Sequence, residues 1–538
     1  MGRTEGDAGQ RPGQRAPGRS GPARLALAES ETLWGLLVRR AELTPGRPLL
    51  LDQSDRSFSC AQIVAWAERV AAGLHERGVG DGTPFSWQLP TRIETVVLSL
   101  ALSRLGAVQN PVIALYRQRE VGSLLRATGA RWLAVLGEWH GFSYGKMARD
   151  LADRAATPVE VLVIDDGLPE GDPGRLPPPP ADGDVVRWLY STSGTTSEPK
   201  AVRHTDSSLL AGGIGIAVAT APEPDDVAAL PFPYAHIGGP DQLVMSLRCG
   251  VPVLLLETFV AAEAVAVLRR HRVTMVGGST AHYLALLAER RRPGGTTVPS
   301  LRIMTGGGAP KPPEVYWQVK RELGVQVRHG YGMTECPMIA MGALGDTDEQ
   351  LAGTDGAPVR DCELRVVDPD GTALAAGLDG ELEVRGPMLA KGYTDPELTA
   401  AAFRPDGWFR TGDRGHLDHD GHVVVTGRTK DLIIRKGENI SPREIEDLLM
   451  THPKVAAVAV IGLPDAERGE RVCAVVESRP GGAPLTFLEL RQHCREAGLM
   501  VQKIPEQLEV VDQLPRNPTL KVLKRELVER FGPVGRPT

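Results

Sequence analysis

The hydrophobic pattern in the first part of the chain predicts helices. In residues 61–77 apolar side chains recur at three- and four-residue intervals, the spacing of one face of an amphipathic helix. Two glycines follow closely, as is common after a helix end. Residues 31–42 show a similar amphipathic pattern, and residues 93–105 predict a third, more apolar helix.

From residue 132 onward, short apolar runs alternate with further helical stretches. Runs that are apolar throughout are typical of parallel strands covered on both faces. Their alternation with helices predicts α/β architecture with mostly parallel sheets. The predicted strands occupy residues 132–136, 161–164, 185–190, 251–256, 273–277, 301–305 and 325–328, and the predicted helices occupy residues 261–271, 280–290 and 313–323.

The pattern changes after Gly353. Residues 363–367, 381–385 and 422–426 predict short strands separated by Asp-Gly turns, so we expect a small β-rich subdomain here. After Arg428 a compact α/β segment begins. It has predicted helices at residues 442–450, 486–496 and from about 522, and predicted strands at residues 455–461 and 471–477.

We place the domain boundary between Thr429 and Lys430. A chain of 538 residues exceeds the roughly 250–300 residues at which single cores usually divide. We expect a large N-terminal domain over residues 27–429, with two α/β subdomains of mostly parallel sheets and the small β-rich subdomain. A small α/β C-terminal domain follows over residues 430–538. Residues 1–26 are rich in Gly, Pro and Arg, which predicts a disordered tail.

The composition is that of a soluble globular protein, with 42% hydrophobic and 24% charged residues. The net charge of −6 argues against a nucleic-acid partner held by a general basic field. The sequence contains no run of 18 apolar residues, so we expect no membrane span. Six scattered cysteines without a CxxC pair favour a reducing compartment and no structural zinc. We therefore expect a cytoplasmic protein, and the Ala-, Arg-, Gly- and Pro-rich composition is typical of a GC-rich bacterial genome.

A loop rich in small hydroxyl residues follows the predicted strand at residues 185–190. Residues 190–204 read YSTSGTTSEPKAVRH, with Lys200 directly behind Pro199. Small residues let the backbone approach a ligand, and N–H and O–H donors with a lysine can hold a polyphosphate. The loop lacks the second glycine before the lysine that a Walker loop requires. Alone, such a loop predicts an exposed turn more often than a binding site.

Four further signatures follow the Ser/Thr loop in order along the chain. They are GYGMTE at residues 330–335, GWFRTGD at 407–413, GRTKDLIIRKGENI at 427–440 and LPRNPTLKVLKREL at 514–527. With these five signatures the chain resembles, over roughly residues 30 to 530, the adenylate-forming superfamily. That superfamily includes acyl-CoA synthetases, luciferases and the adenylation domains of peptide synthetases.

The resemblance implies an ATP-dependent, AMP-forming acid–thiol ligase. A carboxylic acid attacks the α-phosphate of ATP (or the enzyme starts from acyl-AMP), and a thiol then displaces AMP. Coenzyme A and Mg²⁺ are implied as second substrate and cofactor. Both steps place negative charge on phosphate oxygens, so the site needs donors and cations. The C-terminal domain is implied to be mobile and to rotate between the half-reactions about a hinge at Lys430.

The resemblance also implies roles for individual residues. Asp413 would bind the ribose hydroxyls, Glu335 would hold Mg²⁺, and His236 would close the acyl pocket. The implied catalytic residues are Lys521, His236, Thr334 and Glu335. ATP or AMP would contact Thr192, Ser193, Gly194, Thr195, Thr196, Lys200, Gly307, Gly308, Ala309, Tyr331, Gly332, Met333, Thr334, Asp413 and Arg428, and coenzyme A would contact Gly437, Glu438 and Asn439.

Two departures from the family pattern bear on the activity. Ala201 replaces a glycine after Lys200 and would restrict the backbone if a positive φ is required there. Leu520 replaces the glycine next to Lys521, which removes backbone freedom and adds bulk. If the Leu520 side chain points outward, Lys521 keeps its place. If Lys521 is displaced, adenylation suffers while thioester formation is spared.

The function that we expect is an acyl-CoA synthetase for a bulky or medium- to long-chain carboxylic acid. Residues 137–144, 233–241 and 277–283 resemble the branch that activates alicyclic and medium-chain acids. One alternative is an enzyme that only transfers a preformed acyl-adenylate to coenzyme A, with a partner enzyme that makes the adenylate. Others are a loader of a separate acyl carrier protein and a non-enzymatic module with a decayed site. The sequence also leaves a homodimer open.

Overall fold

The structure is a computed structural model that describes residues 25–192, 200–435, 438–465, 467–479, 481–517 and 520–532, without the side chains of Thr192, Glu438 and Asn439. The predicted ligand contacts Ser193, Gly194, Thr195, Thr196 and Gly437 lie outside these residues, as does nearly all of the expected tail. Among the described residues, no helix combines the length and apolar character needed to cross a bilayer.

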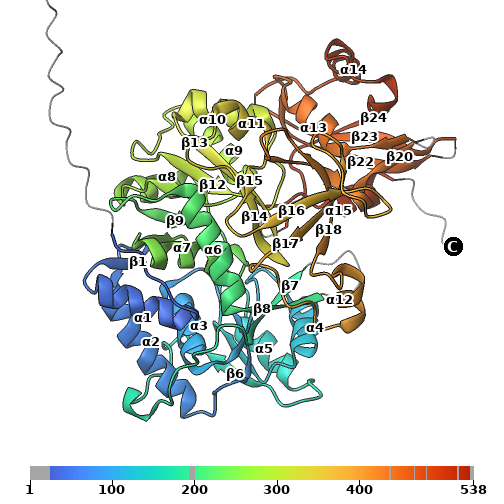
Figure 1. Cartoon of the computed structure of the whole chain (residues 1–538). Coiled ribbons are helices and arrows are strands. Elements are labelled where there is room, and N and C mark those ends of the chain that lie inside the picture. Colours follow the sequence, from blue (N-terminus) through green and yellow to red (C-terminus); the bar gives the residue numbers. More distant parts are fainter. Residues whose placement is uncertain are drawn as a thin grey trace, which may run out of the picture.

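A six-stranded sheet forms the first α/β subdomain, drawn in cyan below the centre of Figure 1. Its strand order is β6-β5-β3-β4-β7-β8, and every pair is parallel except β7 with β8. The strands are β3 (Pro84–Gln88), β4 (Val108–Pro111), β5 (Trp132–Val135), β6 (Glu160–Val163), β7 (Val186–Thr192) and β8 (Lys200–Thr205).

A nine-stranded sheet forms the second subdomain, in the order β15-β14-β13-β12-β11-β9-β10-β1-β2. The strands from β13 to β1 are parallel, and β2, β14 and β15 pair antiparallel at its two edges. The strands are β1 (Pro48–Asp52), β2 (Ser57–Ser59), β9 (Ala228–Leu230), β10 (Val253–Leu255), β11 (Met275–Val276), β12 (Ile303–Gly306), β13 (Gln326–Met333), β14 (Cys336–Met341) and β15 (Ala357–Pro358). The two sheets confirm the prediction of mostly parallel α/β architecture.

Helices connect and cover these sheets, as the alternating pattern predicts. They are α1 (Leu33–Leu43), α2 (Cys60–His75), α3 (Ile93–Leu105), α4 (Gln118–Thr128), α5 (Tyr144–Ala152), α6 (Asp206–Thr220), α7 (Gly238–Cys249), α8 (Ala261–Arg270), α9 (Thr280–Arg291), α10 (Pro313–Leu323) and α11 (Asp348–Gly353). The sequences of the central α3 and α6 are largely apolar on all sides. Both helices are accordingly buried over nearly their whole length.

The β-rich subdomain and the C-terminal domain complete the chain. The first is an antiparallel sheet in the order β16-β17-β18-β19, with α12 (Pro396–Ala402) beside it. Its strands are β16 (Glu363–Val367), β17 (Gly380–Arg385), β18 (Phe409–Leu417) and β19 (Val423–Arg428). The C-terminal domain has strands β20 (Ile433–Arg435), β21 (Glu438–Ile440), β22 (Val455–Asp465), β23 (Gly469–Ser478) and β24 (Gln507–Val511), and helices α13 (Pro442–Met450), α14 (Phe487–Glu496) and α15 (Lys524–Phe531).

One predicted boundary is wrong in a way that affects the site. The sequence places the end of a strand at residue 328 and the signature at residues 330–335 after it, but β13 continues to Met333. Pairing with β14, from Gly330 with Met341 to Met333 with Cys336, extends it. Gly330 and Gly332 have no side chains, so this segment lacks the alternation of apolar and polar residues by which a strand is predicted. Tyr331 is therefore held on a strand.

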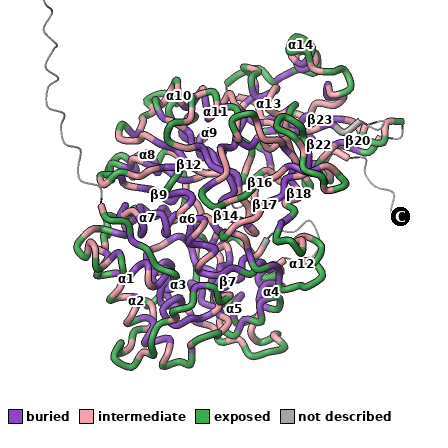
Figure 2. Tube along the Cα trace, in the orientation of Figure 1, coloured by how far each residue is buried: buried purple, intermediate pink, exposed green. Residues whose placement is uncertain are grey.

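Buried side chains form several hydrophobic clusters against the two sheets. Figure 2 shows the buried segments at the centre of the molecule. One hydrophobic cluster includes residues of both domains, among them Val319 of α10 and Leu449 of α13. The C-terminal domain thus packs against the large domain through α13, which contacts α10 and β19. This packing brings the last signature of the sequence to the site described below.

Candidate active site

Tyr331 and Arg428 both hold the carboxylate of Asp413. The Tyr331 hydroxyl donates to Asp413 Oδ2 at 2.8 Å, and Arg428 Nε donates to Oδ1 at 2.8 Å. The three side chains come from β13, β18 and β19, so three of the five signatures meet here. Asp413 is only 4% exposed, and burial followed by the Asp413 charge raises the pKa of Tyr331 well above its ordinary value. Both carboxylate oxygens are fixed and ready to accept from a ligand's hydroxyl groups.

A second carboxylate, Glu335, lies in the turn between β13 and β14. Glu335 Oε1 accepts a 2.7 Å hydrogen bond from the Tyr393 hydroxyl, and its backbone oxygen accepts from the N–H of Ala390. The Lys200 ammonium lies 5.4 Å from the Tyr393 ring centroid. Tyr393 therefore joins the lysine that ends the Ser/Thr loop to the predicted metal ligand, a link that the sequence analysis missed.

His204 fixes the Thr334 backbone beside Glu335. His204 Nε2 donates to the Thr334 carbonyl oxygen at 2.7 Å, and Nδ1 lies 2.8 Å from Ser208 Oγ. Burial lowers the pKa of His204 to about 4, so its ring is neutral near pH 7. His204 is the last residue of the first signature. Its partner Thr334 lies 130 residues away in the chain, so no local sequence pattern predicts their hydrogen bond.

The glycine segment after β12 lies against β13. Gly308 has φ of +76°, and a Cβ at Gly307 would lie 2.4 Å from the Gly330 carbonyl oxygen. Only glycine fits this contact, because a side chain would collide with the backbone. His329 Nε2 donates to the Ala309 carbonyl oxygen at 3.0 Å and fixes the end of the segment. The predicted contacts Gly307, Gly308 and Ala309 thus form a flat backbone surface next to the strand of Tyr331.

His236 precedes α7 and lines a small cavity with Tyr116, Tyr190, Ser191 and Thr334. Its Nδ1 accepts from the N–H of Gly238 at 3.2 Å, and its ring packs edge-on against Phe232. Burial, and then the positive charge of Lys521, lower its pKa to about 4. His236 is therefore neutral near pH 7, and the positive charge of Lys521 contributes to this state.

The C-terminal loop brings Lys521 to the same site. The Asn517 N–H donates to the Lys521 carbonyl oxygen, and the Lys521 N–H donates to Asn517 Oδ1, both at 2.8 Å. Leu520 has φ of +63°, in the left-handed region that favours glycine. Desolvation, and then the charge of Arg428, lower the pKa of Lys521 to about 8 although Asp413 opposes the shift. The loop thus accepts Leu520 and still presents the lysine.

Ala201 does not need the backbone freedom considered in the sequence analysis. It lies within β8, is 1% exposed and is absent from the residues with positive φ. Its carbonyl oxygen accepts from the Thr394 N–H, which ties β8 to the segment before α12. The concern about Ala201 was wrong, because an extended strand residue can be alanine without strain.

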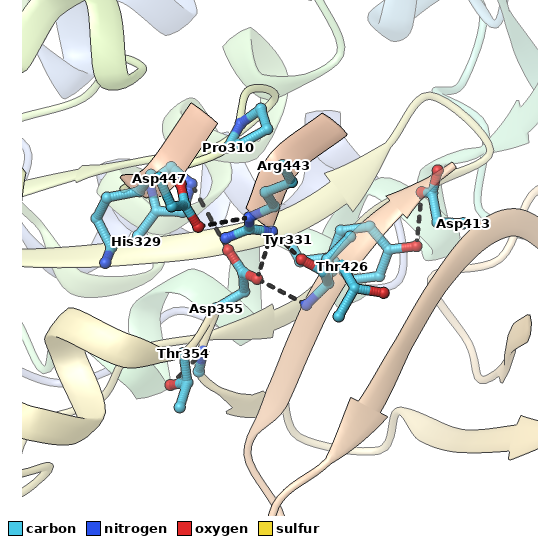
Figure 3. A network of polar contacts seen from close by, with 12 residues as sticks. Pro310, His329, Tyr331, Thr354, Asp355, Asp413, Thr426, Arg443 and Asp447 are labelled. Carbon is cyan, nitrogen blue, oxygen red and sulfur yellow. Dashed lines mark hydrogen bonds and ion pairs between the residues drawn. The ribbon is translucent and has the colours of Figure 1, made fainter. Parts of the chain in front are cut away.

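The domain interface lies directly behind Tyr331, as Figure 3 shows. Arg443 of α13 bonds the Val425 carbonyl oxygen and lies 3.3 Å from Asp355 Oδ2. Asp447 Oδ2 lies 3.7 Å from Arg443 Nε, and His329 Nε2 lies 4.0 Å from Asp355 Oδ1. Lys430 lies in a short 3-10 helix, Thr429–Asp431, between the domains. The network joins the C-terminal domain to the strand that carries Tyr331.

The site suits a magnesium ion that arrives with a polyphosphate. The described residues contain no cluster of three or more His, Cys, Asp or Glu able to form a closed metal cage. Mg²⁺ in nucleotide sites commonly takes only one or two carboxylates together with substrate phosphates. Glu335 offers one carboxylate, oriented by Tyr393, and Lys200 adds a positive charge nearby.

The structure brings together His236, Thr334, Glu335, Lys200, Tyr331, Asp413, Arg428 and Lys521 from the predicted set. Gly332 and Met333 lie on the adjoining part of β13, where a Cβ at Gly332 would lie 2.2 Å from the Pro337 carbonyl oxygen. Glu438 and Asn439 belong to β21 of the C-terminal domain, where they pair with Arg435 and Ile434 of β20.

Two family models match the chain. The model described as AMP-binding enzyme matches residues 37–394, and the model described as AMP-binding enzyme C-terminal domain matches residues 444–521. The chain is 32% identical to the salicyl-AMP ligase / salicyl-S-ArCP synthetase of Mycobacterium tuberculosis, covering 93% of this chain and 91% of the relative. It is 31% identical to the 2-hydroxy-7-methoxy-5-methyl-1-naphthoate–CoA ligase of Streptomyces carzinostaticus, covering 94% of each.

A solved structure shares the fold over most of the chain. O-succinylbenzoate coenzyme A synthetase (MenE) from Bacillus subtilis, in complex with ATP and magnesium ion, superposes with a TM-score of 0.79. The two chains are 29% identical, and the match covers 91% of this chain and 98% of that one.

Proposed function

Because this chain belongs to the AMP-binding enzyme family, we propose that it is an acyl-CoA synthetase for a bulky alicyclic or a medium- to long-chain carboxylic acid. The chain is an ATP-dependent acid–thiol ligase that works through an acyl-adenylate and uses ATP, Mg²⁺ and coenzyme A. The class of acid and the preference for coenzyme A over a carrier protein belong to the proposal. Residues 137–144, 233–241 and 277–283 support the alicyclic or fatty acid.

The observation that carries two-step activity is the position of Lys521. Its charge interacts with those of Arg428 and Asp413 and lowers the pKa of His236, so the loop of the C-terminal domain reaches the site of the large domain. A lysine at this place can neutralise the acid carboxylate and the α-phosphate as they approach each other. The enzyme that only transfers a preformed adenylate would not need the lysine there.

We propose the remaining roles from the family resemblance, and the geometry of the site supports them. Asp413, held by Tyr331 and Arg428, binds the ribose hydroxyls, and the backbone of Gly307–Ala309 lies along the adenine. Glu335 would hold Mg²⁺, and the bound ion would supply positive charge near the phosphates. In the second step the coenzyme A thiol attacks the acyl carbonyl carbon, the bond to AMP breaks and the thiol proton passes to solvent.

Domain rotation is the remaining part of the proposal. The ion pair of Arg443 with Asp355, and the influence of the Arg428 and Asp413 charges on the pKa of Lys521, belong to one orientation of the domains, which we propose is suited to adenylation. A turn about Lys430 would withdraw Lys521 and bring β21, with Glu438 and Asn439, to the acyl-adenylate. We therefore propose the domain boundary at Thr429 and Lys430 as the hinge.

The test separates the two half-reactions. Purified protein is incubated with ATP, Mg²⁺ and a panel of alicyclic and fatty acids without coenzyme A, and acyl-AMP and pyrophosphate are measured by mass spectrometry. A parallel reaction contains synthetic acyl-adenylates with either coenzyme A or a phosphopantetheinylated carrier protein. Product in both reactions, with coenzyme A as the better acceptor, is the expected result. Thioester only from supplied adenylate would replace the proposal with the transfer-only enzyme.

A carrier-protein loader is the second candidate, and one relative favours it. The name of the Mycobacterium tuberculosis protein refers to a salicyl-S-ArCP product, whereas the Streptomyces carzinostaticus protein is named for a CoA product. A carrier protein that accepts the acyl group at least about tenfold faster than coenzyme A would decide for this candidate.

A further inference from the structure

A cavity of about 470 Å³ lies outside the candidate active site, among α1, α2 and α3, which pack together in Figure 1. One face of α1 forms most of its wall, and Glu68 of α2, Arg104 of α3 and Pro179 of the loop before β7 complete it. None of these residues belongs to the candidate active site. The volume is within the range of sites for small organic molecules.

Arg104 is a cavity residue whose charge is poorly matched by the surrounding chain. It is only 7% exposed, and its Nη1 atom is buried without a hydrogen-bond partner among the described residues. Burial lowers the pKa of Arg104, and the Glu68 carboxylate opposes this shift through its charge rather than through a hydrogen bond. A buried polar group without a partner is costly, so an acceptor from outside the chain would be bound favourably.

Two other buried arginines of the same region show how a purely structural guanidinium is held. Arg40 of α1 is 0% exposed, and its Nε and Nη2 donate to the carbonyl oxygens of Leu247 and Arg248, both at 2.6 Å. Arg187, next to the end of α3, donates to a carboxylate and to a carbonyl oxygen. Arg104 differs from both because it lines a cavity and has a buried nitrogen without an acceptor.

The wall beside Arg104 is apolar. Trp34 and Val38 lie one helical turn apart on α1, and both line the cavity together with Pro179. Arg104 Cζ lies 5.9 Å from the centroid of the Trp34 ring, so the guanidinium lies against the indole. A ligand with an acidic group and a hydrocarbon body would therefore meet the charge and the apolar wall side by side.

The other charges of the cavity limit the ligand to a single negative charge. Arg39 and Glu42 form a 2.8 Å ion pair in which both side chains are about half exposed, so this pair adds no net charge. Glu68 is a second carboxylate in the wall. A polyphosphate would be repelled by the two glutamates, whereas one carboxylate group needs only the Arg104 guanidinium.

We infer that this cavity is a second, non-catalytic site for a small organic monocarboxylate with a ring-shaped hydrocarbon body. Its carboxylate accepts hydrogen bonds from the Arg104 guanidinium, and its body packs against Trp34 and Val38. Arginine suits this task because its planar fork of donors matches the two oxygens of a carboxylate. The site is independent of the proposed function, since no group of the proposed reaction takes part in it.

The test measures binding of three fluorinated probes to the full chain by fluorine NMR. 4-Fluorobenzoate is the monocarboxylate, 4-fluorobenzyl alcohol is a neutral molecule of similar shape, and 4-fluorophenyl phosphate carries a second negative charge. Arg104→Met removes the guanidinium, and Val38→Trp fills the cavity but keeps Arg104. Arg39→Gln is the matched control, because Arg39 lines the same cavity but is already paired with Glu42.

We expect the wild type to bind 4-fluorobenzoate at least about tenfold more tightly than either comparison probe, the effect of one hydrogen bond to a charged group. Arg104→Met and Val38→Trp should each weaken the binding of 4-fluorobenzoate by at least about tenfold, and Arg39→Gln should leave it within about twofold of wild type. Thermal melting followed by circular dichroism shows that each variant is folded.

Binding of 4-fluorobenzoate that persists unchanged in Arg104→Met and Val38→Trp would mean that the probe occupies another site, such as the active site, and would overturn the inference. Equal binding of the alcohol, tighter binding of the phosphate, or no binding of 4-fluorobenzoate at millimolar concentrations would also overturn it. If Arg104→Met does not fold, Val38→Trp and the comparison of the three probes on the wild type still decide.

Discussion

Arg443 of the C-terminal domain pairs with Asp355 of the large domain, with 3.3 Å between Nη1 and Oδ2. Asp355 is buried, the Arg443 side chain is 11% exposed, and the N–H of Val425 donates to the same Asp355 oxygen. Burial opposes the charge on Asp355, but Arg443 and then His329 hold its pKa below the ordinary value. The pair is therefore ionised, and the observed orientation of the domains depends on it.

Arg443→Ala should weaken adenylation much more than thioester formation. Loss of one partner of a buried ion pair costs about 3–5 kcal/mol because the other charge stays buried. The C-terminal domain avoids this cost by leaving the orientation in which Lys521 reaches the site. We expect acyl-AMP formation to fall at least about tenfold and transfer from supplied acyl-adenylate to stay within about twofold of wild type.

The control for this prediction is Lys524→Ala, which removes the 2.6 Å ion pair with Glu446 inside the C-terminal domain. It should leave both half-reactions nearly unchanged. A parallel loss of both half-reactions in Arg443→Ala would show that the pair serves stability alone.

The Tyr393→Phe change should weaken the use of Mg²⁺ without removing the ring near Lys200. The phenol hydroxyl orients Glu335 through a 2.7 Å hydrogen bond, and partners of metal ligands typically contribute tenfold to a hundredfold to metal affinity. We expect the Mg²⁺ concentration for half-maximal adenylation to rise roughly tenfold, measured by pyrophosphate release over a Mg²⁺ series.

A change next to Tyr393 serves as control. Phe403 packs edge-on against the Tyr393 ring, so Phe403→Leu disturbs the packing but keeps the hydroxyl. An equal shift in the Mg²⁺ dependence of both variants would contradict the orienting role of the hydroxyl.

The sequence predicts the elements well where one local pattern decides them. Helices α10 and α13 and strand β16 begin and end where the hydrophobic periodicity places them, because their buried faces and turn residues are close in sequence. The five signatures also predict that Asp413, Arg428 and Tyr331 share a site. They cannot show which atoms bond, since the three residues lie on different strands.

The residues that the sequence analysis missed act across long distances in the chain. Tyr393 bonds Glu335 from 58 residues away, and Asp355 meets Arg443 from 88 residues away. Neither residue belongs to one of the five signatures, and a single tyrosine or aspartate has no spacing that reveals its partner. Asp241 lies within residues 233–241, but only the folded structure shows that its carboxyl has no hydrogen-bond partner among the described residues.

Leu520→Gly tests whether the departure from the family pattern is harmful. The left-handed backbone costs a non-glycine residue about 1–2 kcal/mol, part of which glycine loses again through its greater freedom in the unfolded chain. We expect acyl-AMP formation to rise no more than severalfold, because Leu520 already leaves Lys521 in place. Leu520→Ala retains a Cβ and should show no gain.

A rise of a hundredfold or more in Leu520→Gly would mean that the native loop is nearly inactive in adenylation. Acyl-AMP formation is measured by rapid quench in the wild type, Leu520→Gly and Leu520→Ala. The rate of transfer from supplied acyl-adenylate shows that each protein is folded.

Lys521→Ala should abolish adenylation and spare thioester formation. The charged ammonium is the form that can neutralise the carboxylate and phosphate, and its pKa is lowered to about 8 by desolvation and by Arg428. Lysine is protonated below its pKa, so wild-type adenylation should fall as pH rises through about 8. Binding of the anionic substrates would move this limb upward, because nearby negative charge favours the ammonium.

The pH profile of adenylation distinguishes a direct role of Lys521 from a loss of stability in the variant. Asp431 is among the charges that raise the pKa of Lys521, so Asp431→Asn should move the descending limb of adenylation to lower pH. The pH profile of thioester formation from supplied acyl-adenylate should show no descending limb that Asp431→Asn shifts to lower pH. Equal loss of both half-reactions in Lys521→Ala, or a limb that Asp431→Asn leaves in place, would contradict the direct role of the lysine in adenylation.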